Sequence, residues 1–172
     1  VQRLDMAIYK QILATILGVF CIVSATAQVK VAGCYLRMIE PTKSETLKLV
    51  NDTIEVEFGF DNLNFFIDLG IKNLTDQPIE IDWDKTMLLS GESSYPIIFD
   101  DTVLAFKNSP KGKTTIPPKS KIYKKISSDT NVEYNIPLFK KKSVKKYGAH
   151  KVGVYLFVNE TGYRCMFEAT IE

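Results

Sequence analysis

Residues 63–83, which read LNFFIDLGIKNLTDQPIEIDW, alternate between apolar and polar side chains over most of their length. The odd positions from 63 to 71 are apolar, and after a turn-rich segment the alternation resumes at 79, 81 and 83. A period of two is typical of β-strands that bury one face. The stretch therefore predicts two half-buried strands joined by a tight connection, with Trp83 packed in the core.

The rest of the chain also favours short strands separated by turn signals. Residues 54–60 alternate cleanly, and residues 152–171 predict a hairpin that turns at 159–162. The paired prolines at 117–118 cannot donate ladder hydrogen bonds, so they predict an edge or a crossover. Further short strands are predicted at residues 35–39, 86–89, 95–99, 102–106 and 122–126, with a long connection at 129–151. The fold class is therefore all-β and antiparallel, and a two-sheet sandwich is preferred over a fully closed sheet.

The N-terminus has the pattern of a secretory signal peptide. Lys10 supplies a short positive region, and residues 12–23 form an apolar run that is shorter than the span of about 20 residues that crosses a bilayer. Small residues at 24–27 follow, as a signal peptidase requires. A signal peptide helix is therefore predicted within residues 1–27, with an overhang before Met6, and a retained anchor helix is the alternative. The predicted cleavage residues are Ala25, Ala27 and Gln28, the last being the new N-terminus.

Residues 31–34, V-A-G-C, compete with that cleavage site because they resemble the bacterial lipobox, whose cysteine becomes lipidated. In lipoproteins the apolar core runs directly into this motif, whereas Gln28 and Lys30 interrupt it here. Cleavage after Ala27 is therefore favoured over lipidation at Cys34. Both routes predict an exported protein, which is periplasmic, secreted or an outer-membrane lipoprotein.

The cysteines follow from that choice of processing. Cys21 leaves with the signal peptide, so Cys34 and Cys165 remain in an oxidising compartment where a disulfide can persist. A bridge between them would staple the two ends of the domain and contribute about 4–5 kcal/mol by restricting the unfolded chain. If Cys34 is acylated instead, Cys165 is a buried thiol. No C-x-x-C pair is present, so the sequence gives no support to a zinc or thioredoxin-like site.

Charge is divided unevenly along the chain, although the net charge is only +2. Acidic residues dominate residues 40–101, and lysines dominate residues 107–151. The lysine clusters favour a solubilising loop that protects a sheet edge. The alternative is a binding surface, whose natural partner is an anionic surface such as lipid head groups or an acidic glycan. Nucleic acid is disfavoured, because the protein is predicted to be exported and arginine is scarce. The candidate binding residues are Lys140, Lys141, Lys142, Lys145 and Lys146.

Candidate catalytic residues are few. His150 is the only histidine, so any Ser-His or Cys-His constellation would have to use it, but its place predicts a solvated loop end. Paired carboxylates could serve glycoside hydrolysis, and Asp82, Asp84 and Asp100 are the candidates, of which the first two are expected to face solvent. The same acids with Asp76 and Glu80 are a weak calcium candidate, because no D-x-D-x-D-G loop is present. No phosphate-binding glycine loop occurs, and no cofactor is predicted.

Four segments carry a resemblance to a known group of proteins. They are residues 52–60, residues 63–75, the P-I-E-I-D-W run at 78–83 and the T-I-P-P-K-S run at 115–120. Together they resemble small exported immunoglobulin-like proteins of Bacteroidetes and, more loosely, the sandwiches of water-stress and late-embryogenesis-abundant proteins. The resemblance spans about residues 52–123 and implies an Ig-like β-sandwich and export, without any catalytic residue. Asn51, Asn73 and Asn159 each begin an N-x-T sequence, which marks either a turn residue or, in a eukaryotic secretory pathway, a glycosylation acceptor.

The predicted organisation is a signal peptide over residues 1–27, a lead-in segment over 28–50 and an Ig-like β-sandwich over 51–172. The predicted function is that of a non-enzymatic envelope or secreted domain that acts by surface binding. Its partner would be an envelope protein, a glycan or an anionic membrane surface. The alternative is a cell-envelope hydrolase or carbohydrate-active enzyme that uses surface carboxylates.

Overall fold

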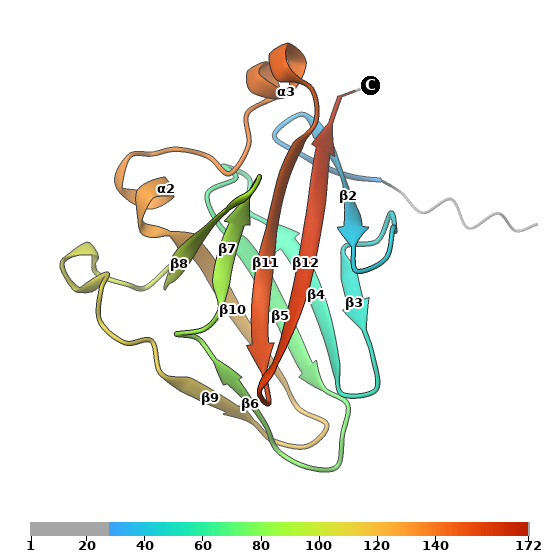
Figure 1. The fold of residues 1–172 in the computed structure, drawn as a ribbon, viewed down its shortest axis with the longest axis vertical. Helices are drawn as coiled ribbons and strands as arrows, with labels where there is room; N and C mark the ends of the chain where they lie inside the picture. Colours follow the sequence, from blue (N-terminus) through green and yellow to red (C-terminus); the bar gives the residue numbers. More distant parts are fainter. Residues whose placement is uncertain (1–27, 172) are drawn as a thin grey trace, which may run out of the picture.

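The computed structural model describes residues 28–171, so the predicted signal peptide lies outside the described residues. The chain is built almost entirely of antiparallel strands, which confirms the all-β prediction (Figure 1). The strands are β1 (Val29–Val31), β2 (Cys34–Glu40), β3 (Lys48–Val50), β4 (Ile54–Phe60), β5 (Ile67–Asn73), β6 (Ile79–Asp82), β7 (Met87–Ser90), β8 (Ser93–Phe99), β9 (Lys113–Ile116), β10 (Lys121–Ser128), β11 (His150–Val158) and β12 (Thr161–Thr170). The short helices are η1 (Leu104–Phe106), α2 (Asp129–Glu133) and α3 (Lys141–Tyr147).

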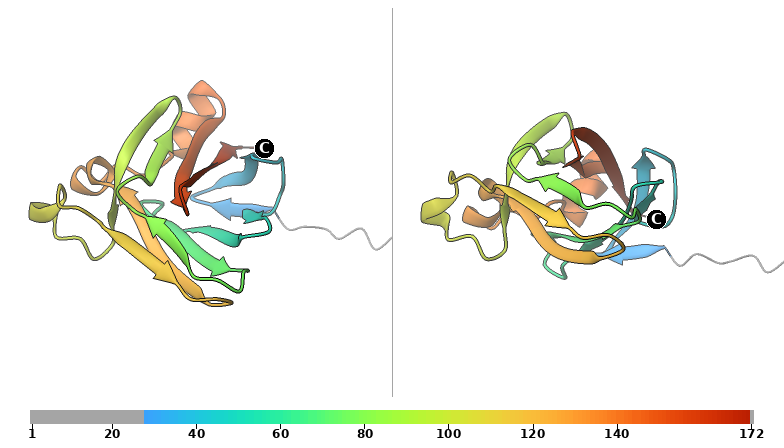
Figure 2. Two further views of the ribbon diagram at one scale, coloured as in Figure 1. Left: turned by 60° about the horizontal axis from the view of Figure 1, so that its bottom comes forward. Right: turned by 90° about the horizontal axis from the view of Figure 1, so that it is seen from below.

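The strands form one curled sheet whose two halves face each other (Figure 2). The first half has the order β1-β2-β12-β11-β7, with β6 and β9 attached through β11. The second half has the order β10-β5-β4-β3. β8 belongs to both, because its residues 93–96 pair with β7 and its residues 97–99 pair with β10. The strand passes from one half to the other near Pro96, which lacks an amide hydrogen and suits a break in a ladder.

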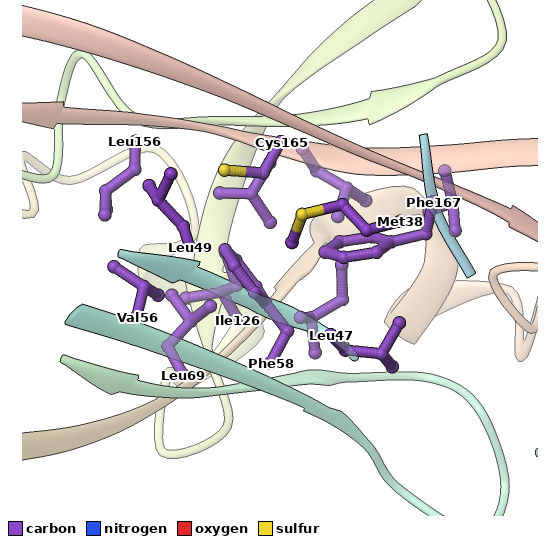
Figure 3. Close-up of a cluster of buried hydrophobic side chains, with 14 of the residues drawn as sticks. Met38, Leu47, Leu49, Val56, Phe58, Leu69, Ile126, Leu156, Cys165 and Phe167 are labelled. Atoms are coloured by element: carbon purple, nitrogen blue, oxygen red, sulfur yellow. The ribbon is translucent and has the colours of Figure 1, made fainter. Parts of the chain in front are cut away.

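Apolar side chains from both halves fill the space between them (Figure 3). The rings of Phe58 on β4 and Phe167 on β12 meet edge to face with their centroids 4.9 Å apart. Trp83 is 1% exposed, and its Nε1 donates a hydrogen bond of 2.8 Å to Thr114 Oγ1. The prediction that Trp83 is a core aromatic is therefore confirmed.

Residues 28–50, predicted as a lead-in, are part of the domain instead. β2 pairs with β12 and β3 pairs with β4, so both ends of this segment lie within the sheet. Leu36, Met38 and Leu49 are buried in the same core as residues from the C-terminal hairpin. The domain boundary predicted at residue 51 is therefore wrong, because strand pairing with the distant C-terminus has no local signal in the sequence.

Two predicted strand segments are turns. β5 begins at Ile67, and Leu63 is 71% exposed, because the Asp61 carboxylate draws the chain into a turn. Its Oδ1 accepts hydrogen bonds of 2.7 Å from the amides of Phe65 and Phe66, which compete with a strand ladder. Residues 102–106 likewise form an exposed loop that contains η1.

The three N-x-T asparagines all form hydrogen bonds with the main chain. Asn51 Oδ1 accepts from the amides of Thr53 and Ile54, and Asn159 Oδ1 accepts from the amide of Glu80 on β6. Asn73 is fully buried, and its Nδ2 donates to the carbonyl oxygens of Gln77, Ile116 and Pro117 at 2.7–3.1 Å. Its Oδ1 accepts from the Thr75 amide at 2.8 Å. Asn73 therefore ties the end of β5 to the proline-containing crossover between β9 and β10, and its amide is not available as a glycosylation acceptor in the folded protein.

Asn73→Ala should lower the free energy of unfolding by about 3 kcal/mol, because the buried carbonyl of Ile116 would lose its side-chain donor. Chemical denaturation of the variant and the wild type measures this difference. Asn62→Ala is the matched control, since Asn62 is exposed, and a change within about 0.5 kcal/mol is expected. Equal effects of the two substitutions would contradict the role of Asn73.

Candidate functional site

The lysine clusters lie on α3 rather than in a loop. Leu138, Phe139 and Val144 are buried, and they anchor the segment to the domain. Asn64 links this segment to the turn before β5, because its Nδ2 donates to the Phe139 carbonyl at 2.8 Å. Gly148, with φ +87°, ends the helix. The lysines therefore sit on a helix fixed by its apolar side.

The lysine side chains share one exposed face of α3. Successive helical residues are rotated by about 100°, so Val144 faces the domain while Lys142 and Lys146 face away from it. Seven lysines elsewhere in residues 28–171 form ion pairs with carboxylates. Within the same residues, no ion pair involves Lys140, Lys141, Lys142, Lys145 or Lys146. Their positive charge is therefore not compensated by ion pairs with any carboxylate of the described residues.

α3 lies at one end of the molecule, next to the turn between β1 and β2 (Figure 1). A Cβ atom on Gly33 would lie 3.1 Å from Lys141 Cδ, so the lysine stem crosses this turn. Tyr147 at the end of the helix is 75% exposed, and Lys146 Nζ lies 4.8 Å from the centre of its ring. This end of the molecule combines cationic side chains with an exposed amphipathic aromatic.

The predicted disulfide between Cys34 and Cys165 is wrong, because both thiols are free and buried. In the antiparallel ladder Tyr35 is opposite Thr170 and Glu40 is opposite Met166. The two cysteines therefore lie at opposite ends of the paired strands, on the order of 20 Å apart at about 3.3 Å per residue. A disulfide needs a Cα separation of about 4–7 Å.

The V-A-G-C motif is a hairpin turn. Val31 pairs with Cys34, and the two residues between them have positive φ, 49° at Ala32 and 77° at Gly33, as a type I′ turn requires. The Cys34 side chain points into the core, so lipidation would have to remove β1 and withdraw the sulfur from its packing. The turn explains the motif without lipidation. Of the predicted cleavage residues, Ala25 and Ala27 lie outside the described residues, and Gln28 is exposed.

Both thiols should be unreactive in the native protein. Burial raises the pKa of the Cys165 thiol to about 12 and also raises the pKa of Cys34, so the thiolate is scarce near pH 8. In a chain that starts at Gln28, we expect negligible reaction with Ellman's reagent under native conditions and two reactive thiols in guanidinium chloride without any reductant. Cys34→Ala should leave one. A protein that needs reductant before its thiols react would contradict the free pair.

The candidate catalytic acids do not come together. Asp82 is buried, contrary to prediction, and its Oδ1 accepts from the amides of Asp84 and Lys85 at 3.2 and 3.3 Å. Asp84 accepts from the amides of Lys111 and Gly112 at 2.7 and 3.0 Å. Asp82 thus holds a local turn, and Asp84 ties that turn to the loop before β9. Asp82, Asp84 and Asp100 border three different hollows of the surface.

The calcium candidates face lysines. Glu80 lies 2.6 Å from Lys113 Nζ, and Asp76 lies 3.1 Å from Lys119 Nζ. In the part of the chain that the structure describes, no three His, Cys, Asp or Glu side chains gather as a metal site would require. Across residues 28–171, no helix has the length and apolar character that a membrane crossing needs.

His150 is half-buried rather than solvated, and it borders a hollow of about 360 Å³. Its Nε2 lies 3.5 Å from Ser90 Oγ, and Leu138 lines the same hollow. Burial lowers the pKa of His150, so the imidazole is neutral at pH 7. This partly buried position of His150 could not be predicted from the sequence, because the residues around the ring come from β7 and from the segment before α3.

A hollow of about 680 Å³ lies on the outer face of the second half, over β4, β5 and β10. Strand alternation predicts that Gly59, Gly70 and Tyr123 point outward, but it does not predict that they line one hollow.

Comparisons of the chain with protein-family models, with curated proteins and with solved structures give no match. The resemblance to exported Ig-like proteins therefore stays a prediction. Function has to be argued from the surfaces described above.

Proposed function

We propose that the protein is an exported, non-enzymatic domain that binds an anionic lipid surface through α3. The observation that carries this proposal is the uncompensated charge of Lys140, Lys141, Lys142, Lys145 and Lys146 on a helix that is fixed to the domain. The Ig-like sandwich class belongs to the same proposal. It is supported by the two facing halves of the curled sheet and by Trp83 between them.

The expected strength can be estimated from the charges. Each lysine near an anionic membrane contributes about 1 kcal/mol, so five contribute about 5 kcal/mol, which corresponds to roughly a 4,000-fold partition in favour of the membrane. The attraction reaches about 8 Å at physiological ionic strength. The exposed ring of Tyr147 adds a group that is common at membrane–water interfaces. Such binding is reversible, and it suits a domain that is also held in place by other contacts.

Wild-type protein should co-sediment with vesicles of phosphatidylcholine and phosphatidylserine and not with vesicles of phosphatidylcholine alone. The triple substitution of Lys142, Lys145 and Lys146 by Gln should lower the partition coefficient by about 100-fold, because it removes about 3 kcal/mol of attraction. The measurement is the bound fraction as a function of lipid concentration at low and physiological salt.

The control is the triple substitution of Lys43, Lys85 and Lys119 by Gln, which changes the net charge equally but lies outside α3. It should keep most of the vesicle binding. If both triple variants lose binding equally, the effect is one of net charge, and the α3 surface is refuted. Retention on heparin resin without vesicle binding would point to an acidic glycan instead.

A further inference from the structure

The outer face of the second half has glycines at two outward strand positions. Antiparallel register places Glu57, Gly70 and Tyr123 in one row across β4, β5 and β10. The neighbouring row contains Gly59 and Asp68, with Lys125 opposite Asp68. Each row therefore contains one glycine at an outward position, where a side chain would otherwise stand. Both glycines line the hollow of about 680 Å³.

Tyr123 is held in place within this hollow. A Cβ atom on Gly70 would lie 3.2 Å from Tyr123 Cε1 and 2.9 Å from Lys121 Cε, so both side chains rest over the glycine. Lys121 Nζ lies 4.9 Å from the centre of the tyrosine ring and is ion-paired with Glu57. Tyr123 is nevertheless 73% exposed. The result is a preorganised aromatic surface that is open to solvent.

Polar groups of both charges surround this ring. Lys125 Nζ lies 3.6 Å from Asp68 Oδ1, and this oxygen has no hydrogen-bond partner. Asp100 and Asp101 border the same hollow from the end of β8. The Lys121 hydrogen bond lowers the pKa of Glu57, which keeps this carboxylate ionised at neutral pH. The face therefore offers charged acceptors and donors side by side, with the four carboxylates of residues 57, 68, 100 and 101 outnumbering the lysines.

We propose that this hollow, lined by Tyr123, by Gly59 and Gly70, and by the polar groups of Glu57, Asp68 and Lys125, binds a neutral oligosaccharide. An open aromatic ring matches the apolar C–H face of a pyranose, as amphipathic aromatics do at mixed surfaces. Hydroxyl groups both donate and accept hydrogen bonds, so they match adjacent carboxylates and ammonium groups. The volume lies within the range of about 300–1,000 Å³ for small-molecule sites.

Other ligand classes fit this face less well. An anionic ligand would be repelled by the carboxylates of residues 57, 68, 100 and 101. A cationic ligand would have to compete with Lys121 and Lys125, which are already paired with Glu57 and Asp68. An apolar peptide or lipid chain would leave the charged groups without partners, which is unfavourable. A polyhydroxylated neutral chain can engage both signs. This site is separate from α3, so the inference does not rest on the proposed membrane contact.

The test is a titration of isotopically labelled protein with oligosaccharides, in which NMR spectra record the amide chemical shifts. The five probes, each used separately, are cellohexaose, maltohexaose, xylohexaose, mannohexaose and chitohexaose. At about 10 mM sugar, a dissociation constant in the millimolar range is detectable. We expect at least one probe to shift the amides of Gly59, Gly70 and their strand neighbours. The absence of shifts with all five, or shifts confined to other elements, would overturn the proposal.

Variants separate stacking from a structural role of Tyr123, because a tyrosine over a glycine also stabilises a sheet by itself. Tyr123→Ala should weaken binding at least tenfold, whereas Tyr123→Phe, which keeps the ring, should change it less than threefold. Tyr134→Ala is the matched control, since Tyr134 is 65% exposed but lies after α2, and it should not alter binding.

Gly59→Thr provides the second variant. The backbone at Gly59 does not have positive φ, and a Cβ there would lie 3.3 Å from the Asp68 Cβ, so a strand-favouring residue fits after a small shift. It should fill the hollow and weaken sugar binding about tenfold while leaving the melting temperature unchanged or higher. Unaltered binding in this variant would overturn the site, and the Lys142, Lys145 and Lys146 triple variant should bind sugar as the wild type does.

Discussion

The pairing of β8 with both β7 and β10 is the constraint on which the rest of the structure depends. Main-chain hydrogen bonds continue through this strand from one half of the sheet to the other, so the two apolar faces must oppose each other. That opposition brings together rings that are far apart in sequence, such as Phe58 and Phe167. Burying a side chain of this size contributes about 1.5–3 kcal/mol, and the contribution is available only when both halves are in place.

Strand positions could be predicted from the sequence wherever burial on one face is a local property. β4, β5, β6, β10 and the β11–β12 hairpin fall where the alternation predicts them. The pairing of β2 with β12 could not be predicted, because no local pattern says which strands are neighbours. Near residue 63 the alternation wrongly predicted a strand. The Asp61 carboxylate accepts hydrogen bonds from the amides of Phe65 and Phe66, which favours a turn over a strand ladder.

The candidate sites were predictable to different degrees for the same reason. The lysine run was visible as composition, but its presentation on a helix depends on Val144 packing against the domain. The predicted disulfide was wrong although β2 and β12 are neighbours. Antiparallel register places Cys34 and Cys165 at opposite ends of the two strands. Predicting the hollow around Tyr123 requires the register of three strands, and the periodicity of a single strand does not give that register.

Charge balance distinguishes the two surfaces physically. On the outer face of β4, β5 and β10, cross-strand register places carboxylates next to lysines, as with Asp68 opposite Lys125, and the charges of such a pair largely cancel beyond contact distance. The lysines of α3 form no ion pair with a carboxylate of residues 28–171, so their positive field extends over about a Debye length. Salt therefore acts strongly on attraction to α3 and weakly on contacts within the hollow. A single domain can in this way hold a long-range electrostatic surface and a short-range contact surface without either weakening the other.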